Sequence, residues 1–380
     1  MHSRRQFLTR SAQAAVALTL ARHQAFASAA QKSGLADVYK EDFLLGTALS
    51  THTLAEKNTQ VLDLVAREFN AITAENCMKW GVLEPEPGQW QWGPADEFVN
   101  YGQEHNMAVV GHTLVWHSQA PLWLFKDEQG NPISKAALQE RVEQHINRIM
   151  GRYKGKIHTW DVVNEAVDED KGWRQTGFYK ILGPDYMEQI FRLAHAADPN
   201  AHLIYNDYNM HDPHKRAFLV DVFKGYRQRE VPIHGVGMQT HVGLDYPDLK
   251  EFENSMKAYI DLGLALHMTE MEVDVLPVAW EFTGAEISTG FEYSDQLNPY
   301  ADGLPDKVQQ QLTDRYVQMF ELFLKYRENI ARVTLWGTSD AESWKNNFPV
   351  RGRTNYPLLF DRDWQAKPAY HALKKLKTEA

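Results

Sequence analysis

The sequence predicts a single-domain (β/α)8 TIM barrel of the α/β class. Eight apolar runs of strand length alternate along the chain with longer amphipathic segments of helical period. Parallel strands that are covered by helices on both faces give such continuous apolar runs. No internal repeat and no Ser/Gly/Pro-rich linker divides the 380 residues, which favours one domain.

The eight strands are expected at Leu44–Leu49, Phe69–Thr73, Ala108–Val115, Ile157–Val163, Leu203–Asn206, Gly235–Gln239, Ala265–Thr269 and Val333–Trp336. Between them, apolar residues at a spacing of three or four mark helix faces over 138–149, 190–194 and 312–323. Eight βα units indicate a closed barrel. An open doubly wound sheet is the alternative, but no Gly-x-Gly-x-x-Gly motif follows the first strand.

Residues 1–29 are expected to be an export signal, which leaves residues 30–380 as the folded domain. Ser3-Arg4-Arg5-Gln6-Phe7-Leu8 resembles a twin-arginine signal, and a short apolar run and an Ala-rich cleavage site follow it. The apolar run is too short to span a bilayer. We therefore expect the periplasm or the medium as the location, rather than a cytosolic protein with an unstructured N-terminus.

The bulk composition restricts the partners. The net charge of −10 makes a nucleic-acid partner unlikely on electrostatic grounds. Cys77 is the only cysteine, so there is no internal disulfide and no cysteine for a lipid anchor. Eleven tryptophans suggest platforms on which a ligand stacks. We expect a monomer without a membrane anchor.

Two of the predicted strands end in a glutamate. Glu165 follows Asn164 after the fourth strand, and Glu270 follows the seventh. The two residues are 105 positions apart, which corresponds to three βα units of about 35 residues. Both carboxyl groups are therefore expected on the rim where barrel active sites lie. A pair of carboxyl groups is the minimum apparatus for cleaving a glycosidic bond.

Six motifs then occur in order along the chain. They are Glu75-Asn76-Cys77-Met78-Lys79-Trp80, Gly111-His112-Thr113-Leu114-Val115-Trp116-His117-Ser118-Gln119, Trp160–Ala166, Tyr205-Asn206-Asp207-Tyr208-Asn209, Gln239-Thr240-His241 and Thr269-Glu270-Met271-Glu272. Together they resemble glycoside hydrolase family 10, whose usual activity is endo-β-1,4-xylanase. The resemblance extends from about Phe43 to Leu376.

The resemblance implies a retaining mechanism with Glu165 as general acid/base and Glu270 as nucleophile, two carboxyl groups that would lie ~5–5.5 Å apart. It also implies that His241 orients the nucleophile and that Asn164 holds the sugar 2-hydroxyl. Glu272 lies on the same side of the strand as Glu270 and stands where the family more often has Asp. We assign Glu272 a supporting role.

The resemblance further assigns the sugar-binding residues. Those expected on the non-reducing side are Glu75, Asn76, Lys79, His112 and Gln119, with Trp116, Trp336 and Trp344 as walls. Tyr208 and Asn209 are expected on the leaving-group side, and Gln239 is included among the substrate contacts. Xylose lacks the hydroxymethyl group of glucose, so the indoles of Trp336 and Trp344 could fill that space and favour xylan, with modest discrimination.

No cofactor and no metal ion are expected. Residues 151–157 imitate a phosphate loop, but their glycines are one residue too close and Ile replaces Ser/Thr. His211-Asp212-Pro213-His214 offers metal ligands, but no third ligand is evident. The long irregular span Pro277–Asp306 is rich in aromatic residues and is a hypothesis for the leaving-group subsites.

Two alternative functions stay open. One is a related barrel hydrolase that acts on β-glucan or mannan, because the same pair of strand-end glutamates serves that wider clan. The other is a non-catalytic glycan-binding protein, which the presence of both glutamates disfavours. Activity on xylan compared with cellulose and mannan separates the xylanase from the related hydrolases.

Overall fold

The computed structural model describes residues 33–277, 293 and 295–378. The chain divides into Met1–Gly34 and Leu35–Ala380, and the fold described here is that of the second unit. The expected export signal over residues 1–29 lies outside the described residues. So does most of the span Pro277–Asp306, with the hypothesis attached to it.

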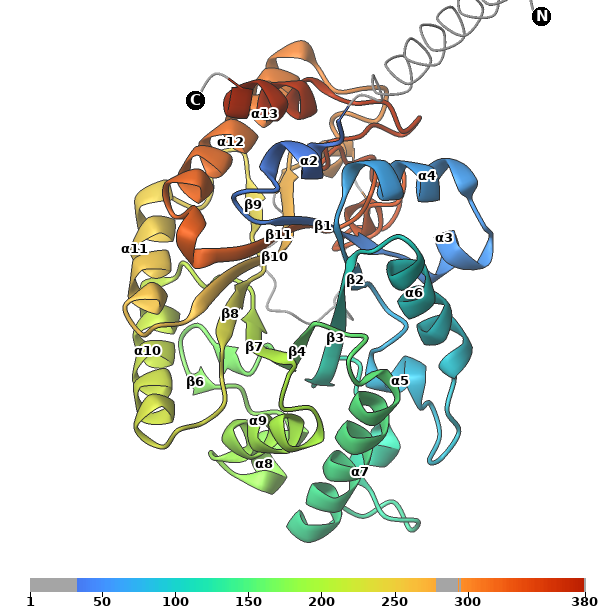
Figure 1. The fold of residues 1–380 in the computed structure, drawn as a ribbon, viewed down its shortest axis with the longest axis vertical. Coiled ribbons are helices and arrows are strands. Elements are labelled where there is room, and N and C mark those ends of the chain that lie inside the picture. Colours follow the sequence, from blue (N-terminus) through green and yellow to red (C-terminus); the bar gives the residue numbers. More distant parts are fainter. Residues whose placement is uncertain (1–32, 278–292, 294, 379–380) are drawn as a thin grey trace, which may run out of the picture. The chain divides into compact units, whose positions relative to one another are not determined.

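Eight parallel strands close into a barrel (Figure 1), which confirms the predicted fold. Their order is β11-β1-β2-β3-β4-β7-β8-β10, and β10 also pairs with β11. The barrel strands are β1 (Leu44–Leu49), β2 (Ala71–Ala74), β3 (Ala108–Trp116), β4 (Thr159–Asn164), β7 (His202–Asp207), β8 (Gly235–Met238), β10 (Ala265–Asp274) and β11 (Ile330–Leu335). Every predicted strand overlaps one of them.

The largest difference from the prediction concerns the seventh barrel strand. It was expected to end at Thr269, but β10 continues to Asp274. The extension arises because the short strand β9 (His241–Gly243) pairs with the last three residues of β10. Glu270 consequently lies within a strand. Met268 before it and Met271 after it both pair with β11.

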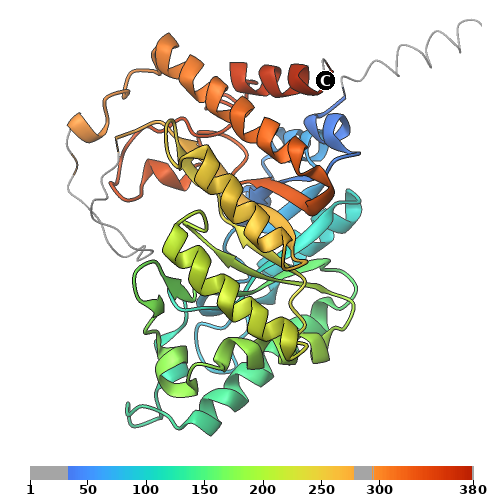
Figure 2. The same ribbon diagram turned by 90° about the vertical axis from the view of Figure 1, so that its left-hand side faces the viewer.

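Helices surround the barrel. They are α2 (Leu35–Tyr39), α3 (Thr51–Ala55), α4 (Thr59–Glu68), α5 (Trp80–Leu83), α6 (Trp92–Glu104), α7 (Lys135–Tyr153), α8 (Gly177–Leu182), α9 (Tyr186–Ala197), α10 (Pro213–Gln228), α11 (Leu249–Ile260), α12 (Asp306–Lys325) and α13 (Pro368–Thr378). Figure 2 shows α10 and α11 side by side on the outside of the strands. The apolar faces predicted within 138–149, 190–194 and 312–323 are buried in α7, α9 and α12.

Four short 3-10 helices and a hairpin complete the described elements. The 3-10 helices are η1 (Leu122–Phe125), η2 (Asp295–Leu297), η3 (Arg327–Asn329) and η4 (Trp344–Asn346). The hairpin consists of β5 (Val167–Asp168) and β6 (Gly172–Trp173) and directly follows β4. No helix in the described part of the chain is both long and apolar enough to cross a bilayer.

Close packing between β3 and β4 requires a glycine at position 111. A side chain at Gly111 in β3 would place its Cβ 2.2 Å from the ring of Trp160 in β4. The indole of Trp160 is buried and occupies the space that any other residue at position 111 would need. Gly111 therefore leaves room for the indole of Trp160 on the side of β4 opposite Asp161, whose carboxylate contacts His112.

Candidate active site

The carboxyl ends of the barrel strands surround a cleft with a cavity volume of about 650 Å³. All fifteen site residues expected from the sequence line it, namely Glu75, Asn76, Lys79, His112, Trp116, Gln119, Asn164, Glu165, Tyr208, Asn209, Gln239, His241, Glu270, Trp336 and Trp344. The fold thus brings residues that are spread over positions 75 to 344 of the sequence into one cleft.

Four further lining residues were not anticipated from the sequence: Tyr246, Lys345, Asn347 and Phe348. They come from the loops that follow β9 and β11, outside the motifs at the strand ends. Phe348 stacks on Trp344 with a centroid distance of 4.9 Å, which extends the aromatic wall of the cleft. In the sequence these four residues are marked only as aromatic or polar residues that follow a strand, which does not show that they reach the cleft.

The backbone of Glu165 is held in an unusual conformation immediately after β4. Its φ angle is +57°, a left-handed value that costs a non-glycine residue on the order of 1 kcal/mol or more. The Glu165 N–H donates to the carbonyl of Asn206 (2.9 Å), and the Glu165 carbonyl accepts from Arg174 Nε (3.1 Å). The neighbouring strand β7 and the residue after the hairpin therefore fix the direction of this side chain.

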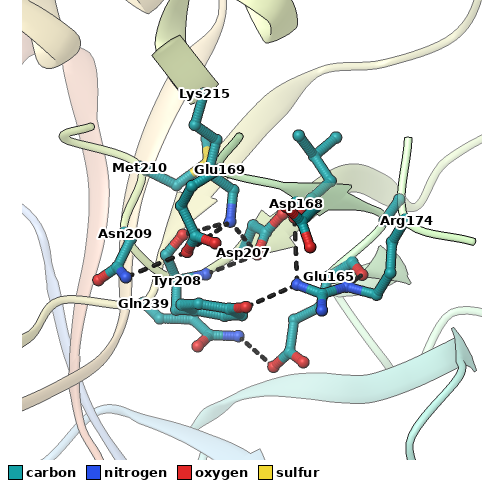
Figure 3. Close-up of polar contacts among 12 residues, drawn as sticks. Glu165, Asp168, Glu169, Arg174, Asp207, Tyr208, Asn209, Met210, Lys215 and Gln239 are labelled. Atoms are coloured by element: carbon teal, nitrogen blue, oxygen red, sulfur yellow. Dashed lines mark hydrogen bonds and ion pairs between the residues drawn. The ribbon is translucent and has the colours of Figure 1, made fainter. Parts of the chain in front are cut away.

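The carboxyl group of Glu165 is buried and accepts hydrogen bonds from neutral donors. Trp116 Nε1 donates to Oε2 at 2.8 Å, and Gln239 Nε2 donates to Oε1 at 3.0 Å (Figure 3). Burial, together with the negative charges of Asp207 and Glu270, raises the pKa of Glu165 to about 7. The two donors oppose it only in part. Glu165 is consequently about half protonated at pH 7 and mostly protonated below it.

Glu270 has the opposite preference. Asn206 Nδ2 donates to its Oε1 at 2.8 Å, and His241 Nε2 lies 3.3 Å from its Oε2. Burial by itself raises the pKa of Glu270, but the hydrogen bond from His241 and the charges of His112 and His241 bring it below its usual value. Between the lowered pKa of Glu270 and about pH 7, Glu270 is therefore ionised while Glu165 holds its proton.

His241 bridges Glu270 and Glu272. Its Nδ1 lies 2.7 Å from Glu272 Oε1, so its two ring nitrogens face two carboxylates. Burial lowers the pKa of His241, but the hydrogen bonds and charges of the two carboxylates outweigh burial and raise it to about 9. Glu272 is fully buried and also accepts from Trp344 Nε1 at 2.8 Å. It does not line the cleft, whereas Glu270 does.

Amide side chains connect the two cleft glutamates. Asn206 Nδ2, which binds Glu270, also donates to Asn164 Oδ1 at 2.9 Å. Asn164 Nδ2 lies 3.3 Å from Glu165 Oε1, which completes the connection. Gly237 in β8 leaves room for this arrangement, because a Cβ at that position would lie 2.3 Å from Asn206 Oδ1. Asn206 belonged to a motif in the sequence, but its role as the link was not foreseen.

One end of the cleft carries a lysine between polar and aromatic groups. Lys79 Nζ donates to Asn76 Oδ1 at 3.0 Å and lies 4.9 Å from the ring centroid of Trp116. Burial lowers the pKa of Lys79, and the charge of Glu75 opposes that change. His112 Nδ1 lies 2.8 Å from Asp161 Oδ2, which fixes the orientation of this ring. This end therefore presents directed hydrogen-bonding groups next to flat apolar surfaces.

The other end of the cleft includes Tyr208 and Asn209, which follow β7. The Tyr208 hydroxyl accepts from Arg174 at 2.6 Å, and Asn209 Nδ2 donates to Glu169 at 3.1 Å. Figure 3 shows that the same Arg174 side chain also faces the backbone of Glu165. These contacts join this end of the cleft to the hairpin β5–β6.

The His-Asp-Pro-His motif has a structural role at the start of α10. Asp212 caps the helix by accepting from the N–H groups of His214 and Lys215, and Pro213 occupies its first turn. His211 Nε2 lies 2.7 Å from the Tyr246 hydroxyl. Within the described residues, no group of three or more His, Cys, Asp or Glu side chains is arranged to hold a metal ion.

Opposite protonation preferences on two carboxyl groups of one cleft meet the requirement for hydrolysing a glycosidic bond. A parallel barrel with this cleft at the carboxyl ends of its strands defines the class as a glycoside hydrolase. The chain belongs to glycosyl hydrolase family 10, whose profile matches residues 34–376.

Individual proteins of known activity agree with this assignment. An endo-1,4-beta-xylanase A of Xylanibacter ruminicola is 44% identical over 340 residues, which are 90% of this chain and 92% of that protein. An endo-1,4-beta-xylanase of Geobacillus stearothermophilus is 40% identical and is covered to 96%, against 88% of this chain. The structure of a family 10 endoxylanase retrieved from sugarcane soil metagenome superposes with a TM-score of 0.88 at 51% identity, covering 90% of this chain and 100% of the other.

Proposed function

We propose that this enzyme is an endo-1,4-β-xylanase that hydrolyses internal bonds of xylan and xylo-oligosaccharides with retention of configuration. The observation that carries the proposal is the opposite shift of pKa on Glu165 and Glu270 within one cleft. The substrate assignment is supported by relatives named endo-1,4-beta-xylanases that align over nearly their whole length.

In the first step, Glu270 is the nucleophile. Its ionised carboxylate attacks the anomeric carbon, while Glu165 donates its proton to the glycosidic oxygen as the bond to the leaving sugar breaks. The products of this step are a free xylan fragment and a xylosyl ester on Glu270. The charged His241 between Glu270 and Glu272 orients the nucleophile and keeps it ionised.

In the second step, Glu165 acts as a base. Its carboxylate, now deprotonated, takes a proton from water as the water oxygen attacks the anomeric carbon and releases Glu270. The ester carries no charge, so the raising effect of Glu270 on the pKa of Glu165 is absent in the intermediate. Asn164 holds the sugar 2-hydroxyl during both steps, where a hydrogen bond strengthens as positive charge develops on the ring.

The binding residues divide between the two sides of the broken bond. Glu75, Asn76, Lys79, His112 and Gln119 are proposed to bind the non-reducing sugars, and Gln239 is proposed as a further substrate contact. Trp116, Trp336 and Trp344 would form the walls of that side, where their flat faces suit the C–H surfaces of a pyranose. Tyr208 and Asn209 are proposed to bind the leaving group. Steric filling by Trp336 and Trp344 favours xylose over glucose by a modest factor.

Export belongs to the proposal as well. The twin-arginine-type signal over residues 1–29 would carry the folded enzyme to the periplasm or the medium. The remaining residues 30–380 would then form the mature catalytic domain. Cleavage of the signal is tested by N-terminal sequencing of the protein recovered outside the cytoplasm.

The test of the function combines substrate choice and stereochemistry. Purified enzyme is expected to hydrolyse xylan far faster than cellulose or mannan. An NMR time course on xylohexaose is expected to show the β-anomer of the product first, followed by mutarotation. Preference for glucan or mannan would favour the related hydrolases, initial α-anomer would refute retention, and binding without hydrolysis would leave only a glycan-binding role.

A further inference from the structure

Behind the cleft, β7 carries a buried charge that the proposed reaction does not use. Successive residues of a strand point to opposite sides, so Asn206 faces Glu270 while Tyr205 and Asp207 lie on the other side. Asp207 is fully buried, and after burial its negative charge is the largest cause of the raised pKa of Glu165, ahead of the charge of Glu270. Its effect on the acid/base therefore exceeds that of the nucleophile.

Asp207 is paired with a lysine that is itself fully buried. Lys215 Nζ lies 2.8 Å from Asp207 Oδ1 and also donates to the Tyr208 carbonyl at 2.8 Å (Figure 3). Lys215 lies in the first turn of α10, where the helix dipole disfavours a cation. The ion pair compensates for that unfavourable position, and Glu169 at 3.9 Å adds a second, more distant carboxylate.

The hydrogen bonds around Asp207 favour its ionised form. Besides Lys215, the Tyr208 N–H donates to Oδ1 at 2.9 Å, and the Tyr205 hydroxyl donates to Oδ2. Burial leaves the pKa of Asp207 above its usual value, although the charge and hydrogen bond of Lys215 oppose the rise. Because Lys215 Nζ and the Tyr208 N–H can only donate, Oδ1 remains an acceptor.

The same residue is connected to the backbone of the acid/base. The Tyr205 hydroxyl, which donates to Asp207, accepts from the N–H of Ala166 at 3.1 Å. Ala166 directly follows Glu165, whose left-handed backbone needs support. The carboxylate of Asp207 thus reaches Glu165 through one hydroxyl and one peptide unit as well as through its electric field.

We propose that Asp207, held by Lys215 and Tyr205, is a positioning residue that keeps Glu165 protonated for attack on the natural substrate. The proposal rests on the assignment of Glu165 as acid/base. Other groups also face Glu165 or act on it by charge: Glu270 from β10, Arg174 after the hairpin, Lys79, Tyr208, Trp116, Gln239 and Asn164. Asp207 is the anion that the reaction leaves unchanged, so its effect persists after Glu270 has formed the ester.

The test is the pH profile of kcat/KM for Asp207→Asn with two substrates. The variant is nearly isosteric and removes one negative charge. The alkaline limb of its kcat/KM profile on xylohexaose is expected to move down by about one pH unit. This shift corresponds to a roughly tenfold lower kcat/KM at pH values above the limb and to little change at about pH 5. On dinitrophenyl β-xylobioside, whose leaving group needs no proton, kcat/KM is expected to change less than twofold.

The chain offers a matched control in a second buried Asp–Lys pair. Asp340 Oδ2 lies 2.8 Å from Lys367 Nζ, both residues are buried, and neither lines the cleft. Asp340→Asn is expected to lower stability in a comparable way without moving the alkaline limb. If Asp207→Asn leaves the limb unmoved, or loses equal activity on both substrates, the positioning role is refuted.

Two further variants keep the test decisive. Lys215→Met removes the cation beside Asp207 and serves as the test if Asp207→Asn fails to fold. It is expected to move the alkaline limb of kcat/KM on xylohexaose. An unmoved alkaline limb refutes the proposal. Glu165→Gln tests the assignment beneath it and is expected to abolish the alkaline limb. A limb that persists in Glu165→Gln would overturn the acid/base role itself, independently of what Asp207→Asn does.

Discussion

Glu165 and Glu270 are the same side chain in two differently charged environments. Both are buried, and burial alone raises the pKa of each. Around Glu165 the strongest charged neighbour is an anion, Asp207, and the donors are neutral. Around Glu270 the charged neighbour is His241, 3.3 Å away, which two carboxylates hold in its charged form.

The comparison teaches that the division of roles follows from the neighbours of each glutamate. A site that needs one protonated and one ionised carboxyl must separate two pKa values that are equal in water. Here β7 influences both glutamates, since Asn206 donates a hydrogen bond to Glu270 and the charge of Asp207 raises the pKa of Glu165. Altering one neighbour should therefore move one limb of the pH profile and leave the other in place.

The largest expected effect comes from removing the nucleophile. Glu270→Ala should reduce kcat on xylan by on the order of 10^5-fold or more, the scale on which loss of a catalytic nucleophile acts. Azide, which is small enough to enter the vacated space, should yield an α-xylosyl azide from an activated aryl xyloside. Recovery of the β-azide from this variant would contradict the assignment of Glu270.

Removing the acid/base should give a smaller and substrate-dependent loss. Glu165→Ala is expected to lower kcat/KM on xylan by about 10²–10⁴-fold, the usual contribution of general acid catalysis. An aryl xylobioside with a good leaving group should lose far less, because its departure needs no proton. Measuring both substrates with one preparation checks the prediction, and equal losses would count against the acid role.

His241→Gln should act on the Glu270 side alone. The histidine lowers the pKa of Glu270, so replacing it with a neutral amide should raise that pKa. The acidic limb of kcat/KM is then expected to move to higher pH by about 1–2 units, with activity lost first at low pH. The alkaline limb, which reports Glu165, should stay in place; a shift of both limbs would show that the two environments are not separable.

The smallest expected effect comes from removing the hydrogen bond that Trp116 donates to Glu165. Trp116 donates to the carboxylate form, so Trp116→Phe should raise the pKa of Glu165 and move the alkaline limb up by about one pH unit or less. Loss of sugar binding would lower kcat/KM at every pH without moving the limb. A downward shift would mean that this hydrogen bond does not favour the ionised form.

Much of the barrel could be predicted because its strands are continuous apolar runs. The helix faces of α7, α9 and α12 were equally readable from their period. The extension of β10 to Asp274 could not be predicted, since it depends on pairing with the three-residue strand β9. Strand-end motifs identified the residues that line the cleft.

What the sequence did not indicate was the support behind those residues. Asn206 and Asp207 were visible within a motif, but the side of β7 on which each lies decides their effect. Lys215 is separated from Asp207 by a helix start, and a fully buried lysine in a first helical turn has no local signature. Tyr246 and Phe348 reach the cleft only through the folding of their loops.

The central claim is that one cleft holds Glu165 protonated and Glu270 ionised at the same pH. The direct measurement is a pH titration of the glutamate side-chain carboxyl carbons by ¹³C NMR, with Glu165→Gln and Glu270→Gln to assign the two resonances. The account predicts that Glu165 titrates near pH 7 and Glu270 below its usual value of 4.5. Equal titration of both near pH 4.5, or the higher value on Glu270, would contradict it.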